Sequence, residues 1–402
     1  MMIRKAILSL TVILLTLTVS GQSAYDLLLK AEAMTSEGNP GKAVSVLSGF
    51  PGLSSDSRLL KALGEAQLKE GDIRGAIASF NSANRLETGT GEYGLAKAYA
   101  LSGDPSTSLY HLERSMKSKF RKSEKEIMLE KAFEKMENKP EWRQFWKTEW
   151  YTFPELKISE IEFYLKAGRT EEARKQLAEL ERNYSGHESV LFGRALLESA
   201  SGRFSGAVAS LSALVAAEPA NEKYLRALAE AQTGASNHAG ASSTYTRLIE
   251  LEVPDADLVL LRAASYRMTG ERQKAMDDIE RYLSIFPGSK KGLSLAGKTE
   301  SALGNNLKAL EYFSENVKLH PNDPESYIDR ADAYLLSKSW QWAINDYSMS
   351  LDLQPDNSRV WLNKGIALLN SGKKADACHD FRKAFSMGNR KAVEYLGKYC
   401  ME

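Results

Sequence analysis

Small apolar, large apolar and polar residues recur along residues 154–391 with a period of thirty-four positions. One place in every period is an alanine, and these alanines are Ala173, Ala207, Ala241, Ala275, Ala309, Ala343 and Ala377. The phase holds through seven consecutive periods without an insertion. Since a period of this length has room for two short helices and their turns, the pattern predicts a row of seven helical hairpins in this block.

Two further columns keep the same phase and indicate how the helices of a hairpin meet. Small residues form a column in the first helix: Ala195, Ala229, Ala263, Gly297, Ala331 and Gly365. Large residues form a column in the second helix: Leu177, Leu211, Tyr245, Ile279, Phe313, Tyr347 and Phe381. Turn glycines separate the two helices: Gly168, Gly202, Gly270, Gly304 and Gly372. Small residues let two backbones approach and large ones fill the space beside them, so we expect these columns to form the core.

Residues 22–120 carry the same signals with looser spacing. Glycines mark the turns at Gly38, Gly71 and Gly103, and the alanine column continues as Ala43, Ala76 and Ser108. The large-residue column continues as Leu47, Phe80 and Leu112. The intervals are thirty-three and thirty-two residues, so we expect about three less regular repeats in this N-terminal block.

The unit from Asn322 to Pro355 resembles the tetratricopeptide repeat most closely, with family residues at Tyr327, Ala331, Tyr334, Ala343, Tyr347 and Pro355. The resemblance covers most of the chain. It implies an all-α fold, a right-handed superhelical solenoid of about ten helical hairpins. Three positions depart from the family pattern: Lys157 replaces an apolar residue, Ile161 a small one and Lys338 the turn glycine.

Residues 121–153 break the register and predict an aromatic-rich helical connector. Apolar residues between Ser123 and Lys139 have helical spacing, and Trp142, Trp146 and Trp150 would share one face of a helix after Pro140. Arrays need their ends covered, which favours a helix that caps the first block and packs against the second. An exposed aromatic patch for a partner is the alternative.

The first residues have the pattern of an export signal. Arg4 and Lys5 precede the apolar stretch Ile7–Val19, and small residues end at Gly21, so residues 1–21 predict a cleaved signal peptide. The stretch is short for a bilayer-spanning helix, which leaves an uncleaved anchor as the alternative. We therefore expect an exported protein that is periplasmic, associated with the outer membrane or secreted, with no integral membrane span after cleavage.

The only two cysteines of the chain are Cys378 and Cys400. In an exported protein an even number of cysteines indicates a disulfide, and two unpaired thiols are the alternative. Residues 392–402 predict a C-terminal capping helix. Tyr399-Cys400 and Ala377-Cys378 resemble the closing helix of exported repeat proteins, and residues 384–396 also faintly resemble a Sel1-like unit.

No pattern in the chain indicates catalysis, a cofactor or a metal. The histidines are scattered, and no nucleophile elbow, phosphate loop or dinucleotide fingerprint occurs. Lys and Arg number 53 against 52 Asp and Glu, without a basic block, so the electrostatic signature of a nucleic-acid-binding protein is missing. We expect a protein that is not an enzyme and binds no nucleic acid.

The resemblance implies a concave groove lined by the first helices of successive repeats, with protein or peptide segments as partners. The candidate groove residues are Phe192, Leu196, Lys223, Arg226, Leu260, Lys291, Ile328, Asp329, Arg359 and Asn363. In an alternative interpretation, Phe192, Leu196, Leu260 and Ile366 fill the seam between repeats. We expect a scaffold or adaptor of the cell envelope, and the alternative is a structural subunit or assembly factor of envelope, outer-membrane or secretion machinery.

Some family members hold a chaperone's C-terminal carboxylate with lysine, arginine and asparagine from three repeats. The matching places here hold Ser294 with Lys298, then Asp329, then Arg359 with Asn363. Because Asp329 would repel a carboxylate, that specialised function is not expected of this chain.

Overall fold

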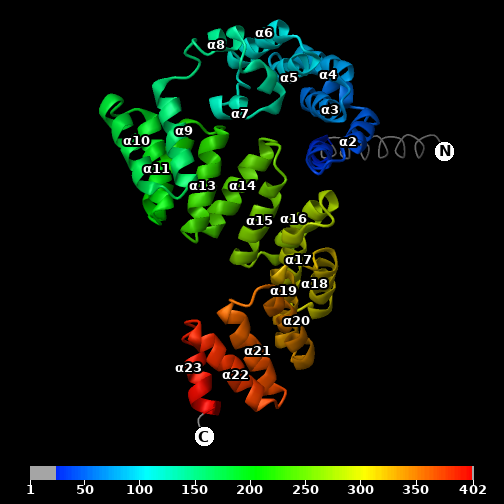
Figure 1. Ribbon diagram of the computed structural model, residues 1–402, viewed down its shortest axis with the longest axis vertical. Helices are drawn as coiled ribbons and strands as arrows, with labels where there is room; N and C mark the ends of the chain where they lie inside the picture. The colour runs from blue at the N-terminus through cyan, green and yellow to red at the C-terminus, as the bar shows by residue number, and fades with distance from the viewer. Residues whose placement is uncertain (1–23, 401–402) are drawn as a thin grey trace, which may run out of the picture. The chain divides into compact units, whose positions relative to one another are not determined.

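The computed structural model describes residues 24–400, and the elements it contains there are all helical (Figure 1). This confirms the predicted all-α fold. The predicted signal peptide, residues 1–21, lies outside the described residues. Among the helices that the structure does describe, none combines the length and the apolar character needed to cross a bilayer.

The helices are short, and most contain thirteen or fourteen residues. The first spans residues 24–36. It is followed by α2 (Pro40–Ser48), α3 (Ser57–Glu70), α4 (Ile73–Leu86), α5 (Glu92–Ser102), α6 (Pro105–Met116), α7 (Glu124–Met128), α8 (Pro140–Phe145), α9 (Phe153–Lys166), α10 (Thr170–Asn183), α11 (Glu188–Ala200), α12 (Phe204–Ala217), α13 (Glu222–Gly234), α14 (His238–Glu250), α15 (Asp257–Thr269), α16 (Arg272–Ile285), α17 (Lys290–Leu303), α18 (Asn306–Leu319), α19 (Pro324–Leu336), α20 (Trp340–Leu353), α21 (Ser358–Asn370), α22 (Lys374–Ser386) and α23 (Ala392–Tyr395). Short 3-10 helices lie at η1 (Leu53–Ser55) and η2 (Lys131–Met136), and the π-helical turn η3 (Leu396–Cys400) ends the described chain.

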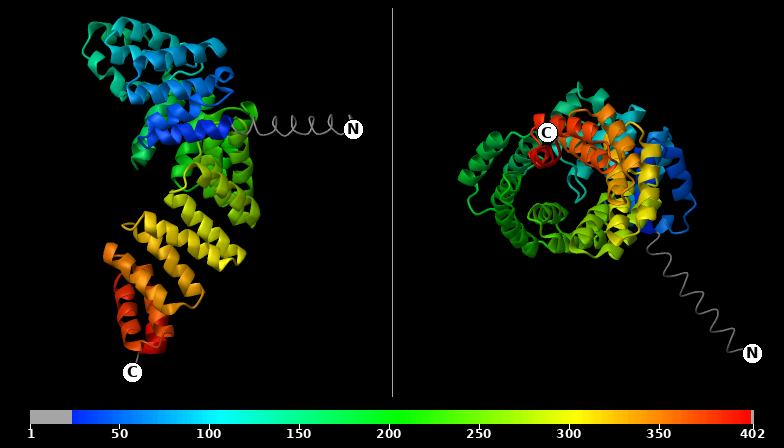
Figure 2. Two further views of the ribbon diagram at one scale, coloured as in Figure 1. Left: turned by 90° about the vertical axis from the view of Figure 1, so that its right-hand side faces the viewer. Right: turned by 90° about the horizontal axis from the view of Figure 1, so that it is seen from below.

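The chain divides into two compact units. Unit 1 contains the residues up to Gly234 together with the loop Glu250–Asp255, and unit 2 contains Ala235–Ile249 and the residues from Ala256 onward. Within each unit consecutive helices pack in pairs, such as α3 with α4 in unit 1 and α19 with α20 in unit 2. Figure 2 shows α16 to α23 of unit 2, coloured yellow to red, following one another in chain order.

The alanine column is the point of contact between paired helices. All seven alanines of the column are fully buried, and Tyr347 and Phe381 of the large-residue column are fully buried as well. A Cβ atom added to Gly365 would lie 2.6 Å from the Phe381 ring, which is too close for a side chain. The predicted register is therefore the register of the core.

The turns between paired helices need a left-handed backbone, which glycine adopts at little cost. Gly304 and Gly372, for example, have φ of 85° and 84°. Lys338, which replaces the glycine of its repeat, also adopts φ of 59°. The turn geometry is thus retained without its usual residue.

The aromatic connector is less regular than predicted. Helix α8 ends at Phe145, so Trp142, Trp146 and Trp150 do not continue along one helix face. Instead the chain turns back, and Trp150 Nε1 donates to the carbonyl oxygen of Phe145 at 2.9 Å. The segment 123–139, predicted as one helix, is split into α7 and η2.

The connector covers the end of the N-terminal repeats. Ile127, Phe133 and Trp142 are buried in one cluster with Leu112 and Met116 of α6. These side chains therefore cap the first block and do not form an exposed aromatic patch.

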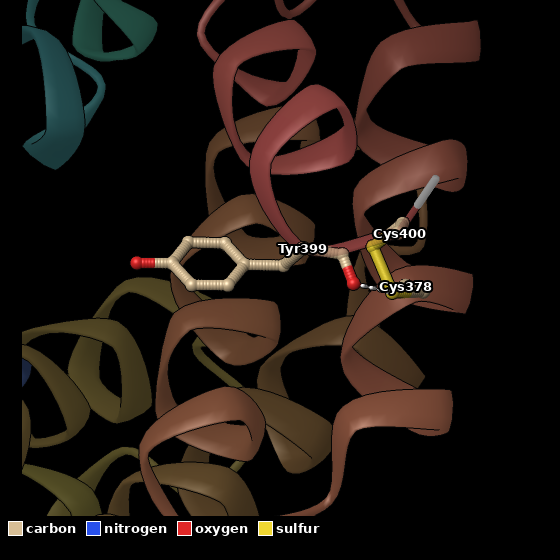
Figure 3. Close-up of a disulfide and its surroundings, with 3 residues drawn as sticks. All are labelled: Cys378, Tyr399 and Cys400. Atoms are coloured by element: carbon tan, nitrogen blue, oxygen red, sulfur yellow. Dashed lines mark hydrogen bonds between the residues drawn. A yellow bond between two sulfur atoms is a disulfide. The ribbon is translucent and has the colours of Figure 1, made fainter. Parts of the chain in front are cut away.

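A disulfide joins Cys378 of α22 to Cys400 of η3, with their Cα atoms 5.6 Å apart (Figure 3). It fastens the C-terminal turn onto the last helical pair. The ring of Tyr395 stacks on Phe381 with 4.9 Å between centroids, so the closing segment also covers the core of the last repeat. The ring of Tyr399 points away from the disulfide in Figure 3.

Candidate partner-binding surface

The first helices of successive repeats in unit 2 are neighbours, because α17 contacts α19 and α19 contacts α21. We call the surface that they share the first-helix face. Its polar side chains include Lys291, Ser294, Lys298, Glu325, Asp329, Asp332, Arg359 and Asn363. Most of them bond from one repeat to the next, in two groups centred on Asp329 and on Asp332.

Asp329 is the centre of the first group on this face. Its side chain is buried, and Ser294 Oγ of the preceding repeat donates to Oδ2. Lys298 Nζ lies 2.9 Å from Oδ1. The carboxylate that would repel a partner's carboxylate is thus neutralised from within the face, and the exposed end of the group is the Lys298 ammonium.

Asp332 is the centre of the second group, and three side chains from two helices donate to it. The hydroxyl of Tyr347 donates to Oδ1, Asn363 Nδ2 donates to the same oxygen at 3.2 Å, and Arg359 Nη1 lies 3.0 Å from Oδ2. Burial, reinforced by the Asp332 carboxylate, raises the pKa of the Tyr347 hydroxyl. This hydroxyl therefore keeps its proton and acts as a donor.

The predicted groove residues of unit 1 are engaged in local contacts. Lys223 Nζ lies 2.9 Å from Glu162 Oε1, and Arg226 lies 2.7 Å from Asp255 Oδ2 and 2.8 Å from Glu222 Oε1. Leu196 is half-buried.

Three apolar residues predicted for the groove are buried. Phe192 is 3% exposed, Leu260 8% and Ile328 0%. Because a buried side chain cannot touch a partner without rearrangement, their place in the structure is the seam between repeats, the alternative interpretation. The sequence could not separate the two roles, since both positions require apolar residues at helical spacing.

Lys291 differs from the other predicted residues. It is exposed and makes no hydrogen bond or ion pair with any residue that the structure describes. The charges that reach the surface of the first-helix face are Lys291, Lys298, Arg359 and the carboxylate of Glu325, whereas Asp329 is buried and Asp332 half-buried. Three exposed cations therefore outnumber the one exposed carboxylate, Glu325, whose charge acts on Arg359.

Within residues 24–400, His, Cys, Asp and Glu side chains form no group of three or more that could hold a metal ion.

Two features of the structure were not predicted from the sequence. The sequence pattern indicated Tyr347 only as a large core residue and not as a hydrogen-bond donor on the first-helix face. A cavity in unit 1 was missed entirely, because its walls come from residues far apart in the chain.

A family model described as tetratricopeptide repeat matches residues 164–222. Tetratricopeptide repeat protein 36 of Bos taurus is 26% identical over 136 residues, which are 32% of this chain and 72% of that protein. The peroxisomal targeting signal receptor of Debaryomyces hansenii is 25% identical over 185 residues, 43% of this chain. The chain spans only 31% of that receptor's length.

A solved structure shows the same fold over a longer range. The crystal structure of a tetratricopeptide repeat protein from Parabacteroides merdae superimposes with a TM-score of 0.51 at 21% identity, covering 62% of this chain and 99% of that one. The repeat register, the paired helices and these matches agree. The chain therefore has a tetratricopeptide-like repeat structure, and its residues 164–222 match that family's model.

Proposed function

We propose that the protein is a non-enzymatic scaffold that binds acidic peptide segments of partner proteins on the first-helix face of unit 2. The observation that carries the proposal is a row of three exposed cations on that face, Lys291, Lys298 and Arg359, where Asp329 is buried, Asp332 is half-buried and Glu325 is the exposed carboxylate. Complementary charge of this kind selects partners and speeds their association.

The linked side chains support recognition by a preformed surface. Tyr347, Arg359 and Asn363 are held by Asp332, so a partner would not have to order them on binding. Rigid donors lose less conformational entropy in a complex than free side chains do. An extended segment could then contact alternate residues along the row.

We further propose that the protein acts outside the cytoplasm, as a scaffold of the cell envelope. The charged and apolar pattern of residues 1–21 supports export. The disulfide between Cys378 and Cys400 supports it independently, because disulfides persist mainly in oxidising compartments. The partner is then an envelope or secreted protein with an accessible acidic segment.

The test reverses the charge of the face. In a pull-down from the exported fraction, the variant Lys291→Glu with Arg359→Glu should lose partners that the wild-type chain retains, while its circular dichroism stays unchanged. The matched control Lys318→Glu with Lys383→Glu makes the same charge change on the exposed sides of second helices. Equal capture by both variants would refute binding on the first-helix face.

A second candidate function is a structural subunit of an envelope assembly, held through the edge of the repeats. The observation that favours it is a set of exposed apolar side chains at helix ends in unit 2. These are Met268 at 55% exposure, Leu307 at 81%, Leu336 at 77% and Trp342 at 64%. Photo-crosslinkers placed at Leu336 and at Lys291 in intact cells separate the two functions by the position that forms the crosslink.

A further inference from the structure

Unit 1 contains a cavity of about 570 Å³, a volume within the range of small-molecule sites. Its wall is built from the helix 24–36, from α3, from the region of Thr90 and Phe120, and from Glu222 with Pro254. All of these segments belong to unit 1. The cavity is separate from the first-helix face of unit 2.

Two contacts hold the loop Glu250–Asp255 at the side of this cavity. The hydroxyl of Tyr25 donates to the carbonyl oxygen of Val253, and both residues are buried. Arg58, which lines the cavity, pairs with Glu252 and also with Asp56, the latter at 2.8 Å. The loop is therefore tied to the N-terminal repeats of unit 1, and the cavity is a built feature rather than a gap between loose segments.

Most charged groups in the wall already have a partner of opposite charge. Glu65 pairs with Lys97, Glu87 with Lys119, and Glu222 with Arg226. Three charged wall residues make no hydrogen bond or ion pair with the described residues: Glu32, Lys61 and Lys69. Glu32 and Lys61 are close enough that each feels the charge of the other.

The Glu32 side chain is exposed and Lys61 is half-buried, and both lie among the wall residues of the cavity. Burial raises the pKa of Glu32 to about 7, against the opposing effect of Lys61. Burial likewise lowers the pKa of Lys61, against the opposing effect of Glu65. The charged form of each group thus lacks the stabilisation that a bound opposite charge would give.

We propose that the cavity binds a small zwitterion, an amino acid or a di- or tripeptide with free ends. Its ammonium group would pair with Glu32 and its carboxylate with Lys61. Leu28 and Phe120 supply apolar wall for the side chains of such a ligand. This would be a second binding activity, independent of the capture of protein segments in unit 2.

Titration calorimetry of the full chain tests the proposal with leucine, alanyl-leucine and alanyl-leucyl-alanine as probes. At least one probe should bind, and the three affinities distinguish an amino-acid site from a peptide site. N-acetylation of the bound probe should weaken binding about tenfold or more, and amidation of its carboxylate should do the same, since each removes one charged pair.

Two variants assign the two ends of the ligand. Glu32→Gln should remove the sensitivity to N-acetylation but keep the sensitivity to amidation, and Lys61→Met should do the opposite. Lys42→Met, at an exposed lysine of α2 that does not line the cavity, is the control and should bind like the wild type. The proposal is overturned if none of the three probes binds at about 10 mM, or if both variants bind every probe as the wild type does. Neither outcome bears on partner capture, which is read from variants in unit 2.

Discussion

Arg330 and Asp346 form a two-pronged ion pair between the first and second helices of one repeat. Arg330 Nε and Nη2 donate to the two carboxylate oxygens of Asp346 at 2.7 and 2.9 Å. The same relationship, sixteen residues apart, joins Arg262 to Asp278. The pair is a repeating clamp within unit 2 that the alanine column did not reveal.

Asp346→Ala should lower the free energy of unfolding by about 1–3 kcal/mol, because it leaves the partly buried Arg330 without its partner. Urea denaturation followed by circular dichroism measures the change. Asp352→Ala, at an exposed position of the same helix, is the control and should change stability by less than about 0.5 kcal/mol. Equal denaturation midpoints for the two variants would show that the clamp adds nothing.

The repeat register could be predicted because it depends on one kind of information, residue size at fixed spacing. Ala343 and Tyr347 must fit together in every repeat of this fold, so their pattern is visible in the chain. The side-chain pairs are different. In the sequence alone, Arg330 and Asp346 look like ordinary solvated charges. Ile328 is apolar in either role, whether it contacts a partner or fills the seam between repeats.

The cavity of unit 1 could not be predicted for a related reason. Glu32 and Lys61 lie on neighbouring first helices, but the wall is completed by Glu222 and Pro254, which are far away in the sequence. The connector was also misjudged: the spacing of its tryptophans is helical, yet the chain turns after Phe145 because the aromatic side chains pack on α5 and α6 instead of on one helix face.

Ala343→Leu tests the register of the core directly. Ala343 is fully buried where two helices touch, so the larger side chain should overpack the hairpin and cost about 1–3 kcal/mol. Thermal unfolding followed by calorimetry is the measurement. Ala375→Leu, an exposed alanine in α22, is the matched control and should leave the melting temperature nearly unchanged. If both substitutions change the melting temperature by similarly small amounts, the helix contact assigned to Ala343 is wrong.

Lys338→Gly should stabilise the protein by about 0.5–1 kcal/mol. Lys338 has φ of 59°, a backbone conformation that strains a residue with a side chain but not a glycine. Part of this gain is lost because glycine increases the conformational entropy of the unfolded chain. The reverse change, Gly304→Ala, should cost about 1 kcal/mol, because φ there is 85° and the added Cβ meets no other atom within 4 Å. Denaturation midpoints that move in the same direction for both variants would rule out backbone strain as the cause.

Reduction of the Cys378–Cys400 disulfide should loosen the C-terminal turn. The bridge spans 22 residues, for which the chain-entropy account gives about 3 kcal/mol of stabilisation. Hydrogen exchange should show faster exchange in α23 and η3 after reduction, with little change in unit 1. The double variant Cys378→Ala with Cys400→Ala should match the reduced protein and show no further response to reductant. Protection of α23 that survives reduction would mean that packing of Tyr395 on Phe381 suffices.

Glu32 should make the stability of unit 1 depend on pH near neutrality. Burial raises its pKa from 4.5 to about 7, and the groups facing it include Lys61, Glu65 and Asp255. Between these two pH values the folded chain holds a proton that the unfolded chain releases, so the free energy of unfolding falls as pH rises through this window and stays low above it. Glu32→Gln, which mimics the protonated acid, should flatten this slope and be more stable than the wild type at alkaline pH. Urea titrations of both proteins across the window measure it, and Glu37→Gln, an exposed carboxylate just beyond the same helix, should keep the wild-type slope. A slope that persists in Glu32→Gln would assign the titration to another group of the cavity.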